Sequence, residues 1–324
     1  MNKLMLGIAA VAMMVTAGNV NAATRMKLAH NLAEDHPTSQ ALKHFADEVE
    51  EKTGGEVKIK LFLNGVLGSE REVLEQLQNG AVDMTRVGAS SLENFDSIFQ
   101  AFTLPYLFDS EDKFYRVMEG PIADKIYEAS KDSGFVGLTF FDGGARSFYT
   151  KDKPINKPED LKGEKIRVMN SHTSIKMVEL MGGTPTPLAY GEIYTALQQG
   201  VIDGAENNPT ALTLGRHGEV VKYYSFDEHG RIPDFLVIAN ASMEKLTPEQ
   251  QKIVKEAARN ATKFHRDLWS EAVKTAMEEA QSKLGVEFSY PEKAPFREAV
   301  KPLYDEYRKD AAIDSLVGDI LAAE

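Results

Sequence analysis

The chain has 324 residues, of which 43% are hydrophobic and 27% charged. This composition is typical of a folded protein and excludes a collagen, a coiled-coil rod and a disordered chain. The 49 acidic residues outnumber the 37 Lys and Arg, for a net charge of −12, and the basic residues form no cluster, so no nucleic-acid partner is expected. The sequence has no cysteine, which excludes disulfides, thiolate metal sites and a cysteine nucleophile.

Residues 1–22 have the pattern of a secretory signal peptide. Lys3 supplies the positive start, Leu4–Ala17 is apolar, and Val20–Ala22 is an A-x-A-like cleavage site. The alternative is a transmembrane anchor, but the apolar stretch is short for the ~20 residues that a bilayer requires. We therefore expect export, with cleavage leaving a mature chain that starts near Ala23.

Short strand patterns alternate with helical patterns along the mature chain. Strands are predicted at 26–29, 56–63 and 81–87, and helices at 39–52 and 70–78. A second series begins near Phe135 and includes a strand at 165–169 and a helix at 174–181. Alternation of this kind predicts βαβ units and largely parallel sheets. The fold class is therefore α/β, with two sheets.

Two segments of the chain repeat one pattern. Glu72–Asp83 and Glu192–Asp203 share their first Glu and a Leu-Gln-x-Gly-x-x-Asp core, and each predicts a helix, a glycine cap and a buried strand. Convergence could produce so common a unit, but the shared residues favour a duplicated architecture. Residues 86–90 and 205–208 then take matching places at the ends of strands, on either side of a cleft between two lobes.

The C-terminal third contains a long amphipathic pattern. Thr247–Gln250 forms a capping box with proline at the first helical position. A helix from Pro248 to Leu284 would be ~55 Å long, more than the roughly 40 Å width of a ~150-residue lobe. It would therefore run along both lobes, unless two helices meet at a kink near Asn260. The predicted apolar stripe is Ile253, Ala257, Ala261, Phe264, Leu268, Ala272, Ala276 and Ala280.

Common enzyme motifs are missing from the sequence. There is no G-x-S-x-G, H-E-x-x-H, Walker loop or G-x-G-x-x-G after a strand. The seven histidines lack metal-ligand spacing, and His44 and His265 lie within helical patterns as surface or packing residues. We therefore expect no catalysis, no metal and no cofactor.

Three stretches carry polar groups that structure alone does not require. Arg146 lies next to two glycines, Arg167 lies inside an apolar strand, and Asn207 and Asn208 follow another. An arginine in a buried strand needs an anionic partner, which is either an internal carboxylate or a ligand carboxylate held by two parallel hydrogen bonds. The two amides suit hydroxyls or a carboxylate oxygen.

At these residues the chain resembles the substrate-binding proteins of tripartite ATP-independent periplasmic (TRAP) transporters, over essentially the whole mature chain. The motifs that carry the resemblance are Leu67–Glu72, Leu77–Gly80, Leu104–Tyr106, Leu161–Val168, Pro185–Leu188 and Ala196–Asn207. The resemblance implies a two-lobed periplasmic-binding-protein fold, each lobe a mostly parallel sheet flanked by helices, with a long helix across both. It also implies small and large integral-membrane subunits as partners.

The resemblance implies roles for individual residues. Arg167 would be the main clamp on a ligand carboxylate, with support from Asn207 and Arg146, and Tyr190 would form an aromatic wall. The stretches 143–149 and 206–208 look like those of members that bind sugar acids, including hexuronates. Further contacts would come from His30, Asn31, His36, Glu70, Arg86, Asn170 and Asn208.

Several alternatives stay open at this point. Glu70 can be a helix-terminus charge, His36 a turn residue before Pro37, and His229 part of a hinge or of the pocket rim. The expected function is a monomeric periplasmic receptor for glucuronate or galacturonate. The alternatives are a receptor for an aldonate, keto-gulonate or C4-dicarboxylate, an exported lyase or isomerase with His30 or Glu70 as base, and a sensory module. The expected lobes are 23–145 with about 233–271, and 146–232 with about 272–324.

Overall fold

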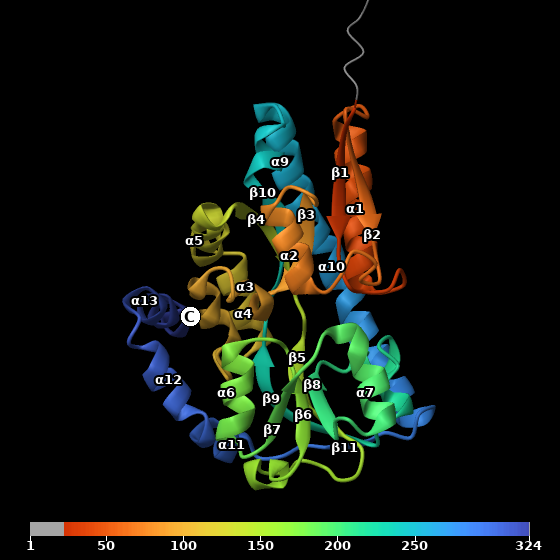
Figure 1. The fold of residues 1–324 in the computed structure, drawn as a ribbon, viewed down its shortest axis with the longest axis vertical. Helices are drawn as coiled ribbons and strands as arrows, with labels where there is room; N and C mark the ends of the chain where they lie inside the picture. Colours follow the sequence, from red (N-terminus) through yellow and green to blue (C-terminus); the bar gives the residue numbers. More distant parts are fainter. Residues whose placement is uncertain (1–22, 324) are drawn as a thin grey trace, which may run out of the picture.

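The computed structural model describes residues 23–323, so the predicted signal peptide lies outside the described residues. The described chain forms two α/β lobes, each built on one sheet and flanked by helices (Figure 1). No helix in residues 23–323 is both long enough and apolar enough to cross a bilayer.

The first sheet has the strand order β2-β1-β3-β10-β4. Strand β1 pairs in parallel with β2 and β3, and β10 pairs antiparallel with β3 and β4, so β10 alone runs against the other strands. Helix α1 joins β1 to β2, and α2 joins β2 to β3. The bounds of these elements are β1 Thr24–Ala29, α1 Pro37–Lys52, β2 Val57–Phe62, α2 Glu70–Gln78, β3 Met84–Gly88, β4 Phe135–Phe141 and β10 Asp234–Ala239.

The second sheet has the order β11-β9-β5-β8-β6-β7, and β5 alone runs against its neighbours. Both sheets are thus mostly parallel in direction, which confirms the predicted fold class. The second series of elements begins at β5, however, and not near Phe135, because β4 belongs to the first sheet. The bounds are β5 Ala145–Thr150, β6 Lys165–Val168, α6 His172–Leu180, β7 Thr184–Pro187, α7 Ile193–Gln199, β8 Gly204–Asn207, β9 Tyr223–Arg231 and β11 Glu287–Ser289.

Shorter helices complete the two lobes and the C-terminal segment. They are α3 Ala89–Leu92, α4 Glu111–Met118, α5 Pro121–Ala129, α8 Thr210–Thr213, α9 Asn240–Glu244, α11 Lys293–Ala299, α12 Lys301–Tyr307 and α13 Ala311–Ala322.

The two copies of the repeated pattern have the same structure in the two lobes. The Asp83 carboxylate accepts the backbone N–H of Lys27 at 2.8 Å, and the Asp203 carboxylate accepts the N–H of Lys165 at 2.8 Å. Gly80 and Gly200, which follow the two helices, have φ of 74° and 71°, where a side chain would be strained. The shared residues therefore place each helix and strand alike, and a position in the first copy of the pattern corresponds to the position 120 further on in the second copy.

Helix α10 (Pro248–Ser282) is unbroken and has 35 residues, which at 1.5 Å per residue is ~52 Å. It packs on α1 and β4 in the first lobe and on α8 in the second (Figure 1). The alternative of two helices is therefore wrong. In the middle of the helix the buried side chains are His265 and Trp269, and the predicted Phe264 is 40% exposed. His265 can be buried because its Nε2 lies 3.1 Å from Thr38 Oγ1.

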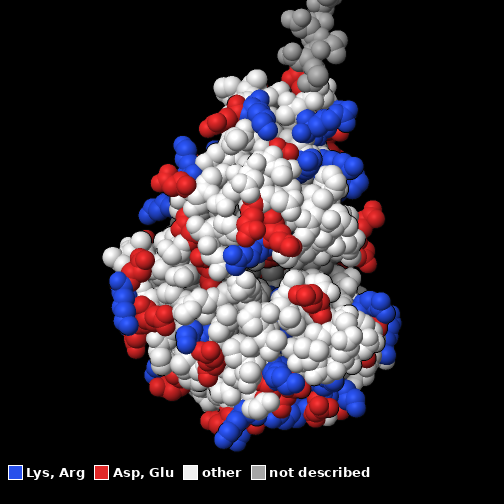
Figure 2. All heavy atoms as spheres, in the orientation of Figure 1, with Lys and Arg blue, Asp and Glu red and all other residues white. Residues whose placement is uncertain are grey.

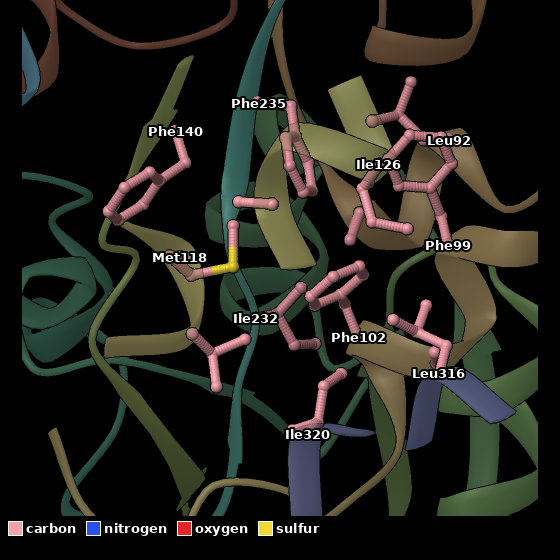
Figure 3. Packing of buried hydrophobic residues seen from close by; sticks show 14 of the residues in the cluster. Leu92, Phe99, Phe102, Met118, Ile126, Phe140, Ile232, Phe235, Leu316 and Ile320 are labelled. Atoms are coloured by element: carbon pink, nitrogen blue, oxygen red, sulfur yellow. The ribbon is translucent and has the colours of Figure 1, made fainter. Parts of the chain in front are cut away.

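The C-terminal helices pack on different clusters of the core. Phe296 of α11 packs in the second lobe, but Leu316 and Ile320 of α13 join the cluster that contains Phe102 and Phe235 (Figure 3). The predicted boundary assigns all of 272–324 to the second lobe. An amphipathic helix does not reveal which lobe receives its apolar face. We propose that residues 301–322 belong to the first lobe.

Candidate binding cleft

A cavity of about 800 Å³ lies between the two lobes. It is visible as a hollow between the upper and lower halves of the molecule in Figure 2. Its walls come from the ends of β3, β6 and β8, where ligands bind in open α/β sheets. The predicted site residues that line it are Asn31, His36, Glu70, Arg86, Arg146, Arg167, Asn170, Tyr190, Asn207 and Asn208.

Arg167 is buried in β6, with 4% of its surface exposed. Its Nε and Nη2 both donate to the carbonyl of Leu188, at 2.9 and 2.7 Å. Within residues 23–323 no carboxylate lies within 4.0 Å of its guanidinium. Burial lowers the pKa of Arg167, and the charge of Glu206 only partly opposes this. The cavity therefore contains a cation whose charge no neighbouring side chain neutralises directly. Such a cation strongly attracts an anionic ligand.

Arg146, by contrast, is neutralised by the protein. Its Nε and Nη2 bind the two carboxylate oxygens of Glu206 at 2.7 and 3.0 Å, and its Nη1 donates to Asn207 Oδ1 at 2.9 Å. Burial acts to raise the pKa of Glu206, but the charges and hydrogen bonds of Arg146 and His229 together outweigh it and lower this pKa to about 2. Arg146 therefore fixes the orientation of the Asn207 amide, whose NH₂ group is left for the cavity.

Asn208, unlike Asn207, forms hydrogen bonds to the protein with both ends of its side-chain amide. Its Nδ2 donates to the carbonyl of Gly143 at 2.7 Å, and its Oδ1 accepts the N–H of Thr210 at 2.9 Å. These bonds tie β8 to the crossing between the lobes. Asn208 lines the cavity, but its polar atoms already have partners within the protein.

His229 lies behind the second-lobe wall and does not line the cavity. Its Nδ1 is 2.8 Å from Asp227 Oδ2, and its Nε2 is 3.3 Å from Glu206 Oε2. Burial acts to lower the pKa of His229, but the charges and hydrogen bonds of Asp227 and Glu206 together outweigh it and raise this pKa to about 9. His229 is thus a buried support of the Arg146–Glu206 pair, near the crossing between β9 and β10.

The first-lobe wall holds two carboxylates around one guanidinium. Arg86 forms an ion pair with Asp234 through Nη2, and its Nη1 lies 3.3 Å from Glu70 Oε1 and 3.4 Å from Asn31 Oδ1. Ser91 Oγ donates to the other oxygen of Glu70 at 2.6 Å. Glu70 is both the first residue of α2 and part of the cavity wall, so its two interpretations are compatible.

His36 and His30 have different places. His36 caps α1, since its Nδ1 accepts the N–H of Thr38 at 3.2 Å, and it also lines the cavity. Burial and then the charge of Arg86 lower the pKa of His36, so the ring is neutral and its proton is on Nε2, as a donor. His30 is 3% exposed and does not line the cavity, contrary to its predicted role. It precedes Asn31, which faces the cavity, and adjacent residues of an extended chain point to opposite sides.

The cavity wall also contains residues that are absent from the prediction, among them Asp142, Asp234 and Trp269. Trp269 stacks on His265 with 5.4 Å between ring centroids and comes from the middle of α10. It is the only tryptophan of the chain, which is a signal the sequence offered. Asp142 pairs with Arg231 at 2.6 Å, and both lie at the crossings between the lobes, which sequence periodicity does not locate.

Comparison with known proteins assigns the family. Residues 28–310 match the model of the DctP family, the bacterial extracellular solute-binding proteins of family 7. The chain belongs to this family. DctP proteins are periplasmic solute-binding components of TRAP transporters, a class without enzymatic activity.

Relatives with known sequence or structure cover nearly the whole chain. YiiZ of Salmonella typhimurium is 44% identical over 87% of this chain and 86% of its own length. A TRAP periplasmic solute-binding protein of Anaerococcus prevotii, solved with bound α/β-D-glucuronate, is 41% identical, with a TM-score of 0.89 over 92% of this chain and 97% of its own. One from Xanthobacter autotrophicus, solved with β-D-galacturonate, is 39% identical, with a TM-score of 0.90 over 92% and 100%.

Proposed function

We propose that this DctP protein captures a hexuronate, such as D-glucuronate or D-galacturonate, in the periplasm and delivers it to the small and large TRAP membrane subunits. The observation that carries the proposal is Arg167, a buried guanidinium that faces the cavity without a carboxylate partner among residues 23–323. The uronates bound by the relatives from A. prevotii and X. autotrophicus support the same ligand class.

The cavity offers complementary partners for the rest of a sugar acid. The ligand carboxylate docks on Arg167 and the NH₂ group of Asn207, because charge-assisted bonds to a carboxylate are the strongest available. Its hydroxyls donate to Glu70 and accept from the Nε2–H of His36, and the rings of Tyr190 and Trp269 pack against its apolar face. Exclusion of water when the lobes close strengthens each of these bonds.

The polar lining favours a polyhydroxylated acid over small C4-dicarboxylates, and the uronates bound by the two relatives favour a uronate over an aldonate or keto-gulonate. The lyase or isomerase alternative has little support, because His30 is off the cavity and Glu70 is held by Arg86 and Ser91 as a hydrogen-bonded carboxylate. We also propose that residues 1–22 are cleaved on export and that the receptor acts as a monomer without a cofactor. A sensory role differs only in the membrane partner.

Calorimetric titration of the mature chain tests the proposal. We expect both uronates to bind with micromolar or lower Kd, and gluconate and succinate to bind more weakly. Arg167→Ala should weaken uronate binding by about 100-fold, or ~3 kcal/mol, because it removes the carboxylate clamp. Lys165→Ala is the matched control, since Lys165 lies two residues away on the same strand with an exposed side chain. Near-normal uronate binding by folded Arg167→Ala would contradict the proposal.

A further inference from the structure

The two walls of the cleft differ in charge at corresponding positions. Thr85 and Ala205 are equivalent, because each follows the repeated aspartate, Asp83 or Asp203, by two residues. In the sheets, Thr85 pairs with Ala29 and Ala205 pairs with Arg167. Ala29 therefore takes the place in the first lobe that Arg167 takes in the second. By the same offset of 120 residues, Glu70 of the first lobe corresponds to Tyr190 of the second, and both line the cavity.

These two differences leave opposite net charges on the walls. On the second-lobe wall Arg146 is neutralised by Glu206, and Arg167 remains as an uncompensated positive charge. On the first-lobe wall Arg86 is shared by Asp234 and Glu70, so one negative charge remains in excess. Both carboxylates are near the ligand space, with side chains 11% and 18% exposed.

The other charged residues of the cavity do not reverse this polarity. Asp142 is paired with Arg231 at 2.6 Å, and Arg71 with Glu75 at 3.1 Å. Two further carboxylates line the cavity from exposed residues, where solvent screens their charge: Glu72 of the first lobe accepts the N–H of Ser69, and Glu192 of the second lobe accepts the N–H of Ala189.

We propose that Glu70 and Asp234 are specificity residues that reject acids with a second anionic group, so that the receptor selects uronates over aldarates. The proposal rests on the proposed function, because it assumes that one carboxylate is held on Arg167. The far end of the ligand then meets the first-lobe wall. Hydroxyls there can donate to the two carboxylates, whereas a second carboxylate is repelled by them and cannot compete for the occupied Arg86.

Neutralising either carboxylate should therefore relax the selectivity. In Glu70→Gln or Asp234→Asn the excess negative charge disappears, because the remaining carboxylate only neutralises Arg86, so the first-lobe wall no longer repels a second ligand carboxylate. We expect the ratio of galactarate affinity to galacturonate affinity to rise at least about tenfold in each variant, given the strength of close charge pairs in a partly buried site. Comparing this ratio between each variant and the wild type cancels the difference in shape between the cyclic uronate and the open-chain aldarate, because both proteins experience it.

The test is calorimetric titration of the mature wild-type chain and the variants with galacturonate and galactarate. Glu50→Gln is the matched control, because it removes one carboxylate from an exposed ion pair with Lys58 in the same lobe, away from the cavity. We expect its ratio to stay within about twofold of the wild type, since surface charges are screened.

The outcomes separate the two proposals. A wild type that binds galacturonate well and galactarate poorly, with a ratio that rises in Glu70→Gln and Asp234→Asn only, supports the inference. A wild type that binds galacturonate while the ratio stays unchanged in both variants overturns the inference alone, as does tight galactarate binding by the wild type. Failure of the wild type to bind any uronate overturns the proposed function and this inference with it.

Discussion

The two walls of the cleft contain the same kind of ion pair with the charges exchanged. Arg86 follows Asp83 by three residues, and Glu206 follows Asp203 by three, so the two occupy corresponding positions on β3 and β8. Each pairs with a residue on the single antiparallel strand of its sheet, Asp234 on β10 and Arg146 on β5. The duplicated architecture thus determines where a buried pair lies, and the local sequence determines which partner carries which charge.

The two pairs differ in how much support they receive. The Glu206 side chain is fully buried, and it is the only acidic partner of Arg146 in the described part of the chain. Asp234 is 11% exposed, and Arg86 keeps a second carboxylate in Glu70 if Asp234 is lost. Loss of one partner should therefore be far costlier in the second lobe than in the first.

Breaking the two pairs measures this difference directly. Glu206→Gln should lower the free energy of unfolding by about 3–5 kcal/mol, because it leaves the buried Arg146 without a counter-charge. Asp234→Asn should cost clearly less, because Glu70 still faces Arg86. Urea unfolding of the two variants and the wild type gives both values. Equal losses would mean that the two pairs are energetically alike, in spite of their different surroundings.

Two buried histidines, His229 of the second lobe and His30 of the first, should affect stability at opposite ends of the pH range. The pKa of His229 is raised to about 9, so its contribution is present below its unfolded value of 6.5 and is lost as the pH rises from 6.5 to 9. Burial, with the charge of Arg86, lowers the pKa of His30 to about 3. Its neutral ring therefore costs stability as the pH falls from 6.5 towards 3, because the unfolded chain takes up the proton.

A single substitution isolates the alkaline part of this profile. The wild type should lose about 3 kcal/mol of unfolding free energy between pH 6.5 and pH 9 on account of His229, at ~1.4 kcal/mol for each pKa unit. His229→Gln should lower stability at pH 6.5 and remove most of this loss, while the decline below pH 6.5 remains. Urea unfolding at pH 5, 6.5 and 9 provides the comparison. An unchanged alkaline decline in the variant would assign it to another group.

The fold was largely predictable because its signals are local. The helix at 70–78 has the predicted bounds, and the repeated Leu-Gln-x-Gly-x-x-Asp core specifies the same helix, turn and strand in both lobes. The partners of β4 and α13 were not predictable, because apolar periodicity shows that a face is buried but not what buries it.

The cleft was predictable only in part, for a related reason. Arg167 stands out because a charged residue interrupts an apolar strand. Asp234 and Trp269 do not, because they reach the cavity from a returning strand and from the middle of α10, more than 60 residues from Arg167. Their contribution depends on how the chain crosses between the lobes, and no local pattern encodes those crossings.

The repeated aspartates provide the finest comparison between the lobes. Asp83 accepts the N–H of Lys27 and also the hydroxyl of Ser242 at 2.5 Å, whereas the Asp203 carboxylate accepts, among residues 23–323, only the N–H of Lys165. Asp83→Ala should therefore cost about 2 kcal/mol of unfolding free energy and Asp203→Ala about 1 kcal/mol, in line with the number of bonds lost. Thermal and urea unfolding of both variants measures the difference. A larger loss for Asp203→Ala would contradict this expectation. It would show that the number of hydrogen bonds does not determine how much each aspartate contributes to stability.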